Sequence, residues 1–191
     1  MLFADLRGFT RLSERKLPYD VVFFLNRYFE VMGEAIDRAG GVIKQFTGDG
    51  VMALFGAHDG PEEDCRKALR AAGAMIEGGL KEILSKILSE ELNELLRMGV
   101  GLHTGPTVVG RMGLGAALYL TTVGDTVHVA SRFQDLTKEY ACQLIISKQV
   151  AECAGLDVSG FPQHELAVRN RTEPIVIRTI ENVEEISGKS V

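Results

Sequence analysis

Two short stretches of β-branched and aromatic residues, Val42–Phe46 and Val51–Phe55, flank the tetrapeptide Thr47-Gly48-Asp49-Gly50. An Asp-Gly pair supplies the positive backbone φ angle that a tight turn between antiparallel strands requires. This segment therefore predicts a β-hairpin with a carboxylate at its tip. Any fold proposed for the chain has to place that hairpin in a sheet.

Helical periodicity is present in three regions of the chain. Apolar residues recur at intervals of three and four from Pro18 to Ala39, from Pro61 to Leu96 and from Asp125 to Lys138. Gly40-Gly41 ends the first helix, and the second region finishes in a leucine-rich stripe that we expect to lie in the core. Further strands are predicted at residues 3–6, 98–103, 107–110, 118–123, 142–146, 165–168 and 175–180.

Hairpins and helices alternate along the chain without a run of strictly parallel strand–helix–strand units. This order favours an α+β sandwich, with one mostly antiparallel sheet and helices on one face, in which residues 98–103 and 107–110 form a second hairpin. The chain has 191 residues, of which 46% are hydrophobic, enough for a sizeable core. We expect one domain over residues 1–182, with a truncated N-terminal strand, and a polar, frayed tail over residues 183–191.

Charge and composition exclude several classes of protein. A formal net charge of −5 argues against a broad nucleic-acid interface, because phosphate backbones are bound by clustered Lys and Arg. The longest apolar runs, such as Val21–Leu25, are far shorter than the roughly 20 residues of a membrane span. Three widely spaced cysteines, Cys65, Cys142 and Cys153, form no disulfide framework, which favours a reducing, cytoplasmic location.

Two acidic residues, Asp5 and Asp49, each lie beside glycine at the end of a predicted strand. If the two strands are neighbours, the carboxylates converge, and a hard cation such as Mg²⁺ would relieve their repulsion. The segment Gly8-Phe9-Thr10 offers backbone N–H groups suited to phosphate. Alternatively, Asp49 only forms the turn and Asp5 only caps the turn that follows it. Taken together, the residues favour a metal and phosphate site.

Four segments follow one another along the chain: FADLRGFT at residues 3–10, FTGDGVMALF at 46–55, GLHTGP at 101–106 and VGDTVHVASR at 123–132. In order and spacing they resemble the landmarks of class III nucleotide cyclase catalytic domains, the adenylate/guanylate cyclase family. The resemblance implies a ferredoxin-like α+β fold and a head-to-tail homodimer. It also implies conversion of a nucleoside triphosphate into its 3′,5′-cyclic monophosphate and pyrophosphate.

The resemblance also implies roles for individual residues. Asp5 and Asp49 match the family's metal-binding carboxylates, with the Leu6 carbonyl as an additional ligand, and the implied cofactors are two divalent cations, Mg²⁺ or Mn²⁺. Arg132 matches the arginine that stabilises charge on the α-phosphate in the transition state. The remaining implied substrate contacts are Gln45 and Thr121 for the base, His128 for the ribose, and Gly8, Phe9, Thr10 and Arg169 for the phosphates.

Several residues depart from the family pattern. Gln45 stands where most adenylate cyclases have Lys, and strand alternation predicts that the neighbouring Lys44 points to the opposite face. Gln45 and Thr121 can hydrogen-bond adenine or, with the amide flipped, guanine. His128 replaces the usual ribose-orienting Asn, and Ala116 lies where a phosphate-binding Arg is often found.

The sequence thus predicts a homodimeric, metal-dependent purine nucleotide cyclase that prefers ATP, since the Lys-to-Glu change typical of guanylate cyclases is absent. One alternative is a guanylate or mixed-specificity cyclase that uses GTP. Another is a degenerate domain that binds nucleotide and dimerises but only relays a signal; Gln45, His128 and Ala116 are the residues that favour it. We expect the catalytic domain to be part of a longer protein with a regulatory domain upstream.

Overall fold

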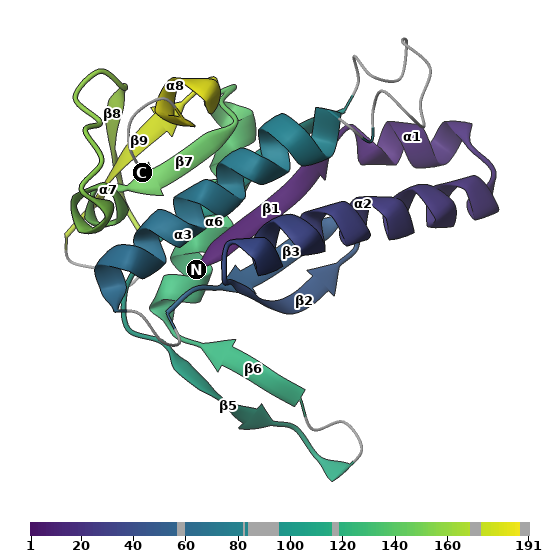
Figure 1. The fold of residues 1–191 in the computed structure, drawn as a ribbon, viewed down its shortest axis with the longest axis horizontal. Helices are drawn as coiled ribbons and strands as arrows, with labels where there is room; N and C mark the ends of the chain where they lie inside the picture. Colours follow the sequence, from purple (N-terminus) through teal and green to yellow (C-terminus); the bar gives the residue numbers. More distant parts are fainter. Residues whose placement is uncertain (57–59, 82, 84–95, 116–118, 169–172, 188–191) are drawn as a thin grey trace.

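A seven-stranded sheet forms the centre of the protein (Figure 1), and in the computed structural model residues 1–56, 60–81, 83, 96–115, 119–168 and 173–187 are described. All neighbouring strands are antiparallel except β4 and β7, which are parallel. The strand order across the sheet is β2 (Val42–Thr47), β3 (Gly50–Leu54), β1 (Leu2–Arg7), β4 (Arg97–Leu102), β7 (Leu144–Ser147), β9 (Ile175–Ile180) and β8 (Gln163–Leu166). The mostly antiparallel α+β architecture is confirmed.

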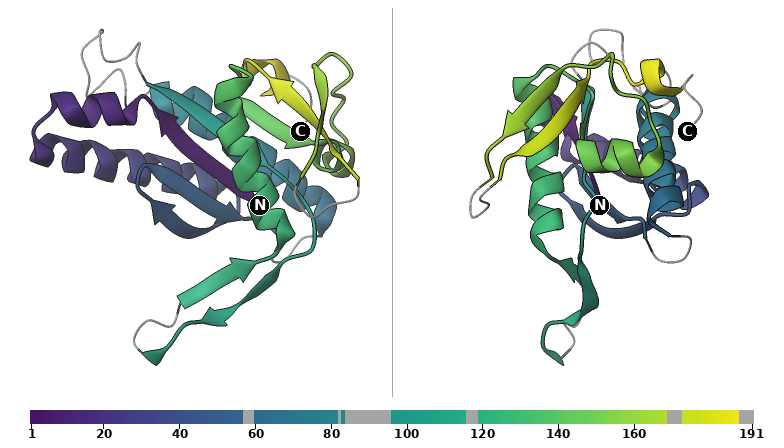
Figure 2. Two further views of the ribbon diagram at one scale, coloured as in Figure 1. Left: turned by 180° about the vertical axis from the view of Figure 1, so that it is seen from behind. Right: turned by 90° about the vertical axis from the view of Figure 1, so that its left-hand side faces the viewer.

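Helices cover both faces of this sheet, so the prediction of helices on one face is wrong. The long helix α2 (Pro18–Arg38) and α3 (Pro61–Gly73), which continues as the π-helical segment η1 (Ala74–Leu80), lie on one side. Helix α6 (Asp125–Glu139) lies on the other, as the right-hand view of Figure 2 shows. The central strands are apolar on both faces: in β7, Leu144 and Ile146 face the α2–α3 core, whereas Ile145 packs with Phe133 of α6.

A two-stranded arm, made of β5 (Val108–Met112) and β6 (Tyr119–Val123), projects from the main body (Figure 1). The expected hairpin between residues 98–103 and 107–110 does not form, because β4 pairs with β1 and β7 while β5 pairs with β6. Four apolar side chains of the arm are exposed: Val108, Val109, Met112 and Val123.

Three short helices complete the description: α1 (Phe9–Arg15), α7 (Lys148–Ala154) and α8 (Glu184–Ser187). Helix α1 replaces the turn expected after Gly8. Val183 and Ile186 are buried in the α2–α3 core, so the chain packs beyond residue 182 instead of fraying there. Of the predicted leucine stripe, residues 84–95 lie outside the described residues, while Ile83 and Leu96 are buried. None of the described helices is long and apolar enough to cross a lipid bilayer.

Close packing of α6 against β4 depends on Gly101. A Cβ atom at this position would collide with the backbone of Ala130 and Gln134 on α6. Because backbone atoms cannot rotate away, even one methyl group would force the helix off the sheet.

We therefore expect Gly101→Ala to lower the free energy of unfolding by about 2–3 kcal/mol, the upper part of the range for overpacked cores. Urea denaturation followed by circular dichroism measures this change. Gly110→Ala is the matched control, because apart from its chain neighbours no atom of the described residues lies within 4 Å of a Cβ built on that β5 glycine. Equal effects of the two substitutions would contradict this account of α6 packing.

Candidate active site

The carboxylates of Asp5 and Asp49 converge, as the sequence predicts. Strand β1 pairs with β3 so that Ala4 lies opposite Val51, which brings the next residue of β1 beside the β2–β3 turn. A Cβ atom on Gly50 would lie 3.4 Å from Oδ1 of Asp5. The Asp5 carboxylate therefore lies against the turn that carries Asp49.

Burial and mutual repulsion act on this carboxylate pair. Burial raises the pKa of Asp5 to about 6, the negative charge of Asp49 adds to the increase, and a hydrogen bond from the Leu6 N–H opposes it. Burial also raises the pKa of Asp49. At neutral pH Asp5 is mainly ionised, and two half-buried carboxylates are a donor set that suits a divalent cation.

The two carboxylates cannot complete a metal centre alone. Within the described residues, no group of three or more His, Cys, Asp and Glu side chains is arranged to hold a metal ion. The remaining ligands would be main-chain carbonyls, such as that of Leu6, the residue after Asp5, together with phosphate oxygens or water. Such open coordination is typical of metals that bind a phosphorylated substrate.

A small cavity of about 220 Å³ adjoins Asp5. Asp5, Thr47 and Met52 line it from the sheet, and Ser131 and Gln134 line it from α6. The cavity thus lies between the C-terminal part of β1 and the helix that covers this face.

The segment Gly8-Phe9-Thr10 forms the start of α1. Gly8 has a left-handed backbone conformation, with φ 86°, which lets the chain turn sharply from β1 into the helix. The first N–H groups of a helix lack intrahelical partners, so those of Phe9 and Thr10 are available to an anion. The ring of Phe9 stacks at 6.5 Å on Phe24 of α2, which anchors the start of α1.

A β-bulge changes the prediction for Lys44. Ile43 and Phe46 both contact α2 although three positions separate them. The register shift between Ile43 and Gln45 explains this, because the extra residue turns Lys44 and Gln45 to the same, opposite face. The expectation that Lys44 points away from Gln45 is therefore wrong. Gln45 pairs with Met52, which lines the cavity beside Asp5.

Thr121 lies on the arm, half-buried and opposite Gly110 in the β5–β6 ladder. Strand β6 is in contact with β2, so the arm brings Thr121 to the edge of the sheet that carries Gln45. That the two side chains contact the same part of a ligand stays a prediction.

His128 and Arg132 are exposed one turn apart on α6. The guanidinium of Arg132 lies 3.8 Å from the carboxylate of Glu139. Arg132 is rotated by about 100° around the helix axis from Ser131, the residue that lines the Asp5 cavity. Arg132 is thus directed away from the carboxylates of its own chain. Arg169 and Ala116 lie outside the described residues.

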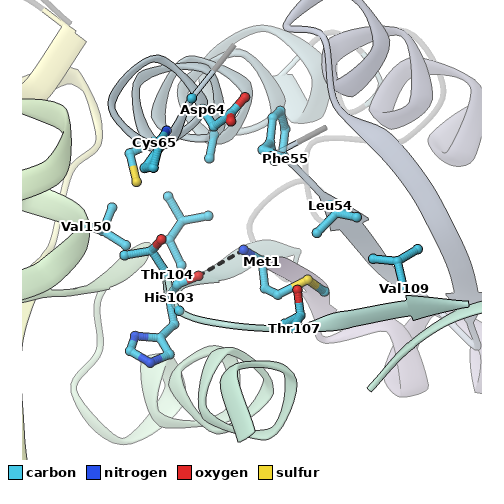
Figure 3. A pocket seen from close by; sticks show the side chains of 16 residues that line it. Met1, Leu54, Phe55, Asp64, Cys65, His103, Thr104, Thr107, Val109 and Val150 are labelled. Carbon is cyan, nitrogen blue, oxygen red and sulfur yellow. Dashed lines mark hydrogen bonds between the residues drawn. The ribbon is translucent and has the colours of Figure 1, made fainter. Parts of the chain in front are cut away.

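A larger cavity of about 430 Å³ lies at the N-terminal end of β1, away from the carboxylates (Figure 3). Here the amino group of Met1 donates a hydrogen bond of 2.8 Å to the His103 carbonyl. Figure 3 shows the His103 ring directed away from the cavity, and its Nδ1 lies 2.9 Å from Oγ of Ser147. His103 is thus held in the core, and none of the predicted site residues lines this cavity.

Sequence reasoning missed Lys138, in the last turn of α6. Its Nζ lies 3.8 Å from Oδ2 of Asp5. This contact joins residues 133 positions apart through the packing of α6 on β1, and no motif in the sequence indicates it.

A protein-family model, described as the adenylate and guanylate cyclase catalytic domain, matches residues 1–178. The chain belongs to this family. Over 157 residues, or 78% of the chain, the cyclase domain is 39% identical to an adenylate cyclase of Anabaena cylindrica. The chain spans 29% of that relative's length.

Two solved structures place the fold of the cyclase domain in the same family. The crystal structure of the guanylyl cyclase Cya2 superimposes with a TM-score of 0.79 and 32% identity, covering 94% of this chain and 89% of the other. The adenylyl cyclase CyaB from P. aeruginosa gives a TM-score of 0.77 and 26% identity, covering 95% and 92%. The fold expected from the family resemblance is confirmed.

The raised pKa of Asp5 predicts that the free energy of unfolding of the metal-free cyclase domain depends on pH. Because the folded-state pKa of about 6 exceeds the ordinary 3.8, the folded state holds this proton more tightly, and stability falls as pH rises through that interval. We expect Asp5→Asn to raise the free energy of unfolding at pH 7.5 by about 1–2 kcal/mol, and by much less at pH 4. Urea titrations without metal at both pH values measure this; a loss of stability at pH 7.5 would contradict it.

Proposed function

We propose that this domain is an adenylate cyclase that converts ATP into 3′,5′-cyclic AMP and pyrophosphate at sites shared between two copies of the chain. The observation that carries the proposal is the convergence of Asp5 and Asp49 beside the first turn of α1. The relative from Anabaena cylindrica, which is named an adenylate cyclase, supports the choice of ATP. We also propose that the domain works in the cytoplasm, where its three free cysteines stay reduced, and within a longer protein that has a regulatory domain.

In this reaction the 3′-oxygen of the ribose attacks the α-phosphorus, the 3′-hydroxyl loses its proton, and the bond to pyrophosphate breaks. Two divalent cations held by Asp5 and Asp49 would supply Lewis acidity that lowers the pKa of the hydroxyl and neutralises the triphosphate. The free N–H groups at the start of α1 suit phosphate oxygens. The residues present therefore fit the chemistry.

Two side chains of α6 fit further roles in this reaction. The guanidinium of Arg132 is always charged and can hydrogen-bond two phosphate oxygens at once, which suits charge developing on the α-phosphate. His128, one turn earlier on the same helix, can donate one hydrogen bond to the ribose. Arg169, whose position is not described, is retained as a contact for the terminal phosphates.

The bulge in β2 gives the base-recognition residues a composition suited to adenine. Lys44 and Gln45 share a face, and Thr121 approaches the same edge of the sheet. An ammonium group only donates hydrogen bonds, so Lys44 can pair with the N1 acceptor of adenine but not with the N1–H of guanine. Gln45 can serve either base. GTP is the second candidate substrate because the guanylyl cyclase Cya2 is 32% identical to this chain.

Exposed apolar surface supports a dimer. The arm exposes Val108, Val109, Met112 and Val123, and the start of α2 exposes Tyr19, Val22 and Phe23. Clusters of exposed apolar side chains of this kind are typical of interaction surfaces. We propose that a second copy covers this surface and that the Arg132 of that copy serves the Asp5–Asp49 pair, because the Arg132 of the same chain does not face it.

Incubation of the purified domain with ATP or GTP and Mn²⁺ tests the activity directly. We expect cyclic AMP and pyrophosphate in equal amounts from ATP, and less product from GTP. Asp49→Asn should remove detectable turnover while the protein stays folded by circular dichroism, because one metal ligand is lost. Wild-type protein that binds nucleotide but makes no cyclic product would favour the degenerate, signal-relaying domain.

Mixing of two inactive variants tests the shared sites. Asp5→Asn and Arg132→Ala homodimers should both be nearly inactive. In a mixed dimer one site collects both lesions and the other collects neither, so random exchange should restore about a quarter of wild-type activity. If subunit exchange is shown by fluorescence energy transfer and no activity returns, the two sites are not shared between chains.

A further inference from the structure

The ammonium group of Lys138 occupies the position of a cation beside the carboxylate pair. Its Nζ lies 3.8 Å from Oδ2 of Asp5. The positive charge of Lys138 lowers the pKa of both Asp5 and Asp49, opposing the effect of burial. One ammonium therefore acts electrostatically on both of the residues that we assign to metal binding.

The two partners of this ion pair differ in their freedom to move. The Asp5 side chain is 25% exposed and is held by β1 between β3 and β4, whereas the Lys138 side chain is 54% exposed at the C-terminal end of α6. A long lysine side chain can turn into water without disturbing the helix. Asp5 is thus held in place by the sheet, and the ammonium beside it can leave.

Other charged side chains lie near Asp5 besides Lys138. Asp135, one turn earlier on α6, adds a further negative charge that raises the pKa of Asp5. Three carboxylates thus lie around this ammonium, and the guanidinium of Arg7, two residues after Asp5 on β1, adds a second positive charge that interacts with Asp5. The net negative charge attracts a divalent cation, while the ammonium, by repulsion at short distance, weakens that attraction.

We propose that Lys138 is a resident counter-cation of the Asp5–Asp49 pair, which a divalent metal ion must displace, so that this residue sets the metal affinity of the site. The inference rests on the proposed function, since it takes Asp5 and Asp49 as metal ligands. In the metal-free domain Lys138 partly relieves the repulsion between the carboxylates. When a metal ion binds, the ammonium is released to solvent and its repulsion no longer opposes the ion.

Mn²⁺ binding to the nucleotide-free domain, followed by electron paramagnetic resonance of the free ion, tests this without turnover. Measurements at pH 8 keep Asp5 ionised, because its pKa is about 6. We expect Lys138→Met to bind Mn²⁺ about three- to tenfold more tightly at low ionic strength, with a smaller gain in high salt. Lys138→Arg, which keeps the positive charge, should bind within about twofold of the wild type.

Lys148→Met is the matched control. Lys148 is 56% exposed and pairs with Glu152 at 3.3 Å on α7, so it resembles Lys138 in exposure and pairing but not in location. Its substitution should leave Mn²⁺ affinity unchanged. A gain in affinity equal to that of Lys138→Met would mean that the change in net charge alone causes the effect, and it would overturn the proposal.

Asp5→Asn separates the two hypotheses. If it abolishes Mn²⁺ binding while Lys138→Met binds no more tightly than the wild type, the metal site stands and the role of Lys138 is wrong. If Asp5→Asn leaves Mn²⁺ binding unchanged, the metal assignment in the proposed function fails, and the counter-cation role fails with it.

Discussion

Strand β1 hydrogen-bonds on both sides, to β3 and to β4, and this central position determines where the chemistry of the domain can occur. Pairing with β3 brings Asp5 to the turn that holds Asp49. Pairing with β4 places the same strand beneath α6, which packs on β4 through Gly101. Alternate residues of β1 then serve different ends: Ala4 and Leu6 are buried in the α2–α3 core, while Asp5 faces the opposite side.

The carboxylate pair destabilises the folded state locally, and the rest of the fold compensates for it. Two half-buried acids that raise each other's energy oppose folding, and the large apolar cores on both faces of the sheet provide the compensating stability. Arrangements of this kind are common where a protein must hold charge ready for a ligand.

Much of the architecture could be predicted from local sequence. The hairpin at residues 42–55 forms with Asp49 at its tip as predicted, but the positive φ of its turn lies at Gly48 and not in Asp49-Gly50. Helix α2 follows from its apolar periodicity. The acids converge as predicted, although Asp5 lies inside β1 and not at its end. The bulge at Lys44 could not be predicted, because it becomes visible only when Ile43 and Phe46 are both seen to contact α2.

Other parts of the site depend on contacts distant in sequence. The burial of both sheet faces depends on the strand order, which places β7 between β4 and β9 and is not encoded in any one segment. The exposure of the apolar residues of the arm likewise could not be predicted, because it depends on β5 and β6 forming a separate two-stranded sheet. Sequence motifs identified the groups that carry charge, and tertiary packing decided which of them meet.

The glycines of β4 have a consequence for the electrostatics of the site. A Cβ atom on Gly99 would collide with Oγ1 of Thr137, the residue just before Lys138, so the absence of a side chain lets the end of α6 settle deeply onto the sheet. How closely α6 packs on the sheet at Gly99 sets the separation between the Lys138 ammonium and the Asp5 carboxylate. Gly99, which lies directly opposite Asp5 in the β1–β4 ladder, therefore acts as an uncharged spacer, so a change in β4, a strand that contributes no ligand, would alter the electric field at the carboxylates.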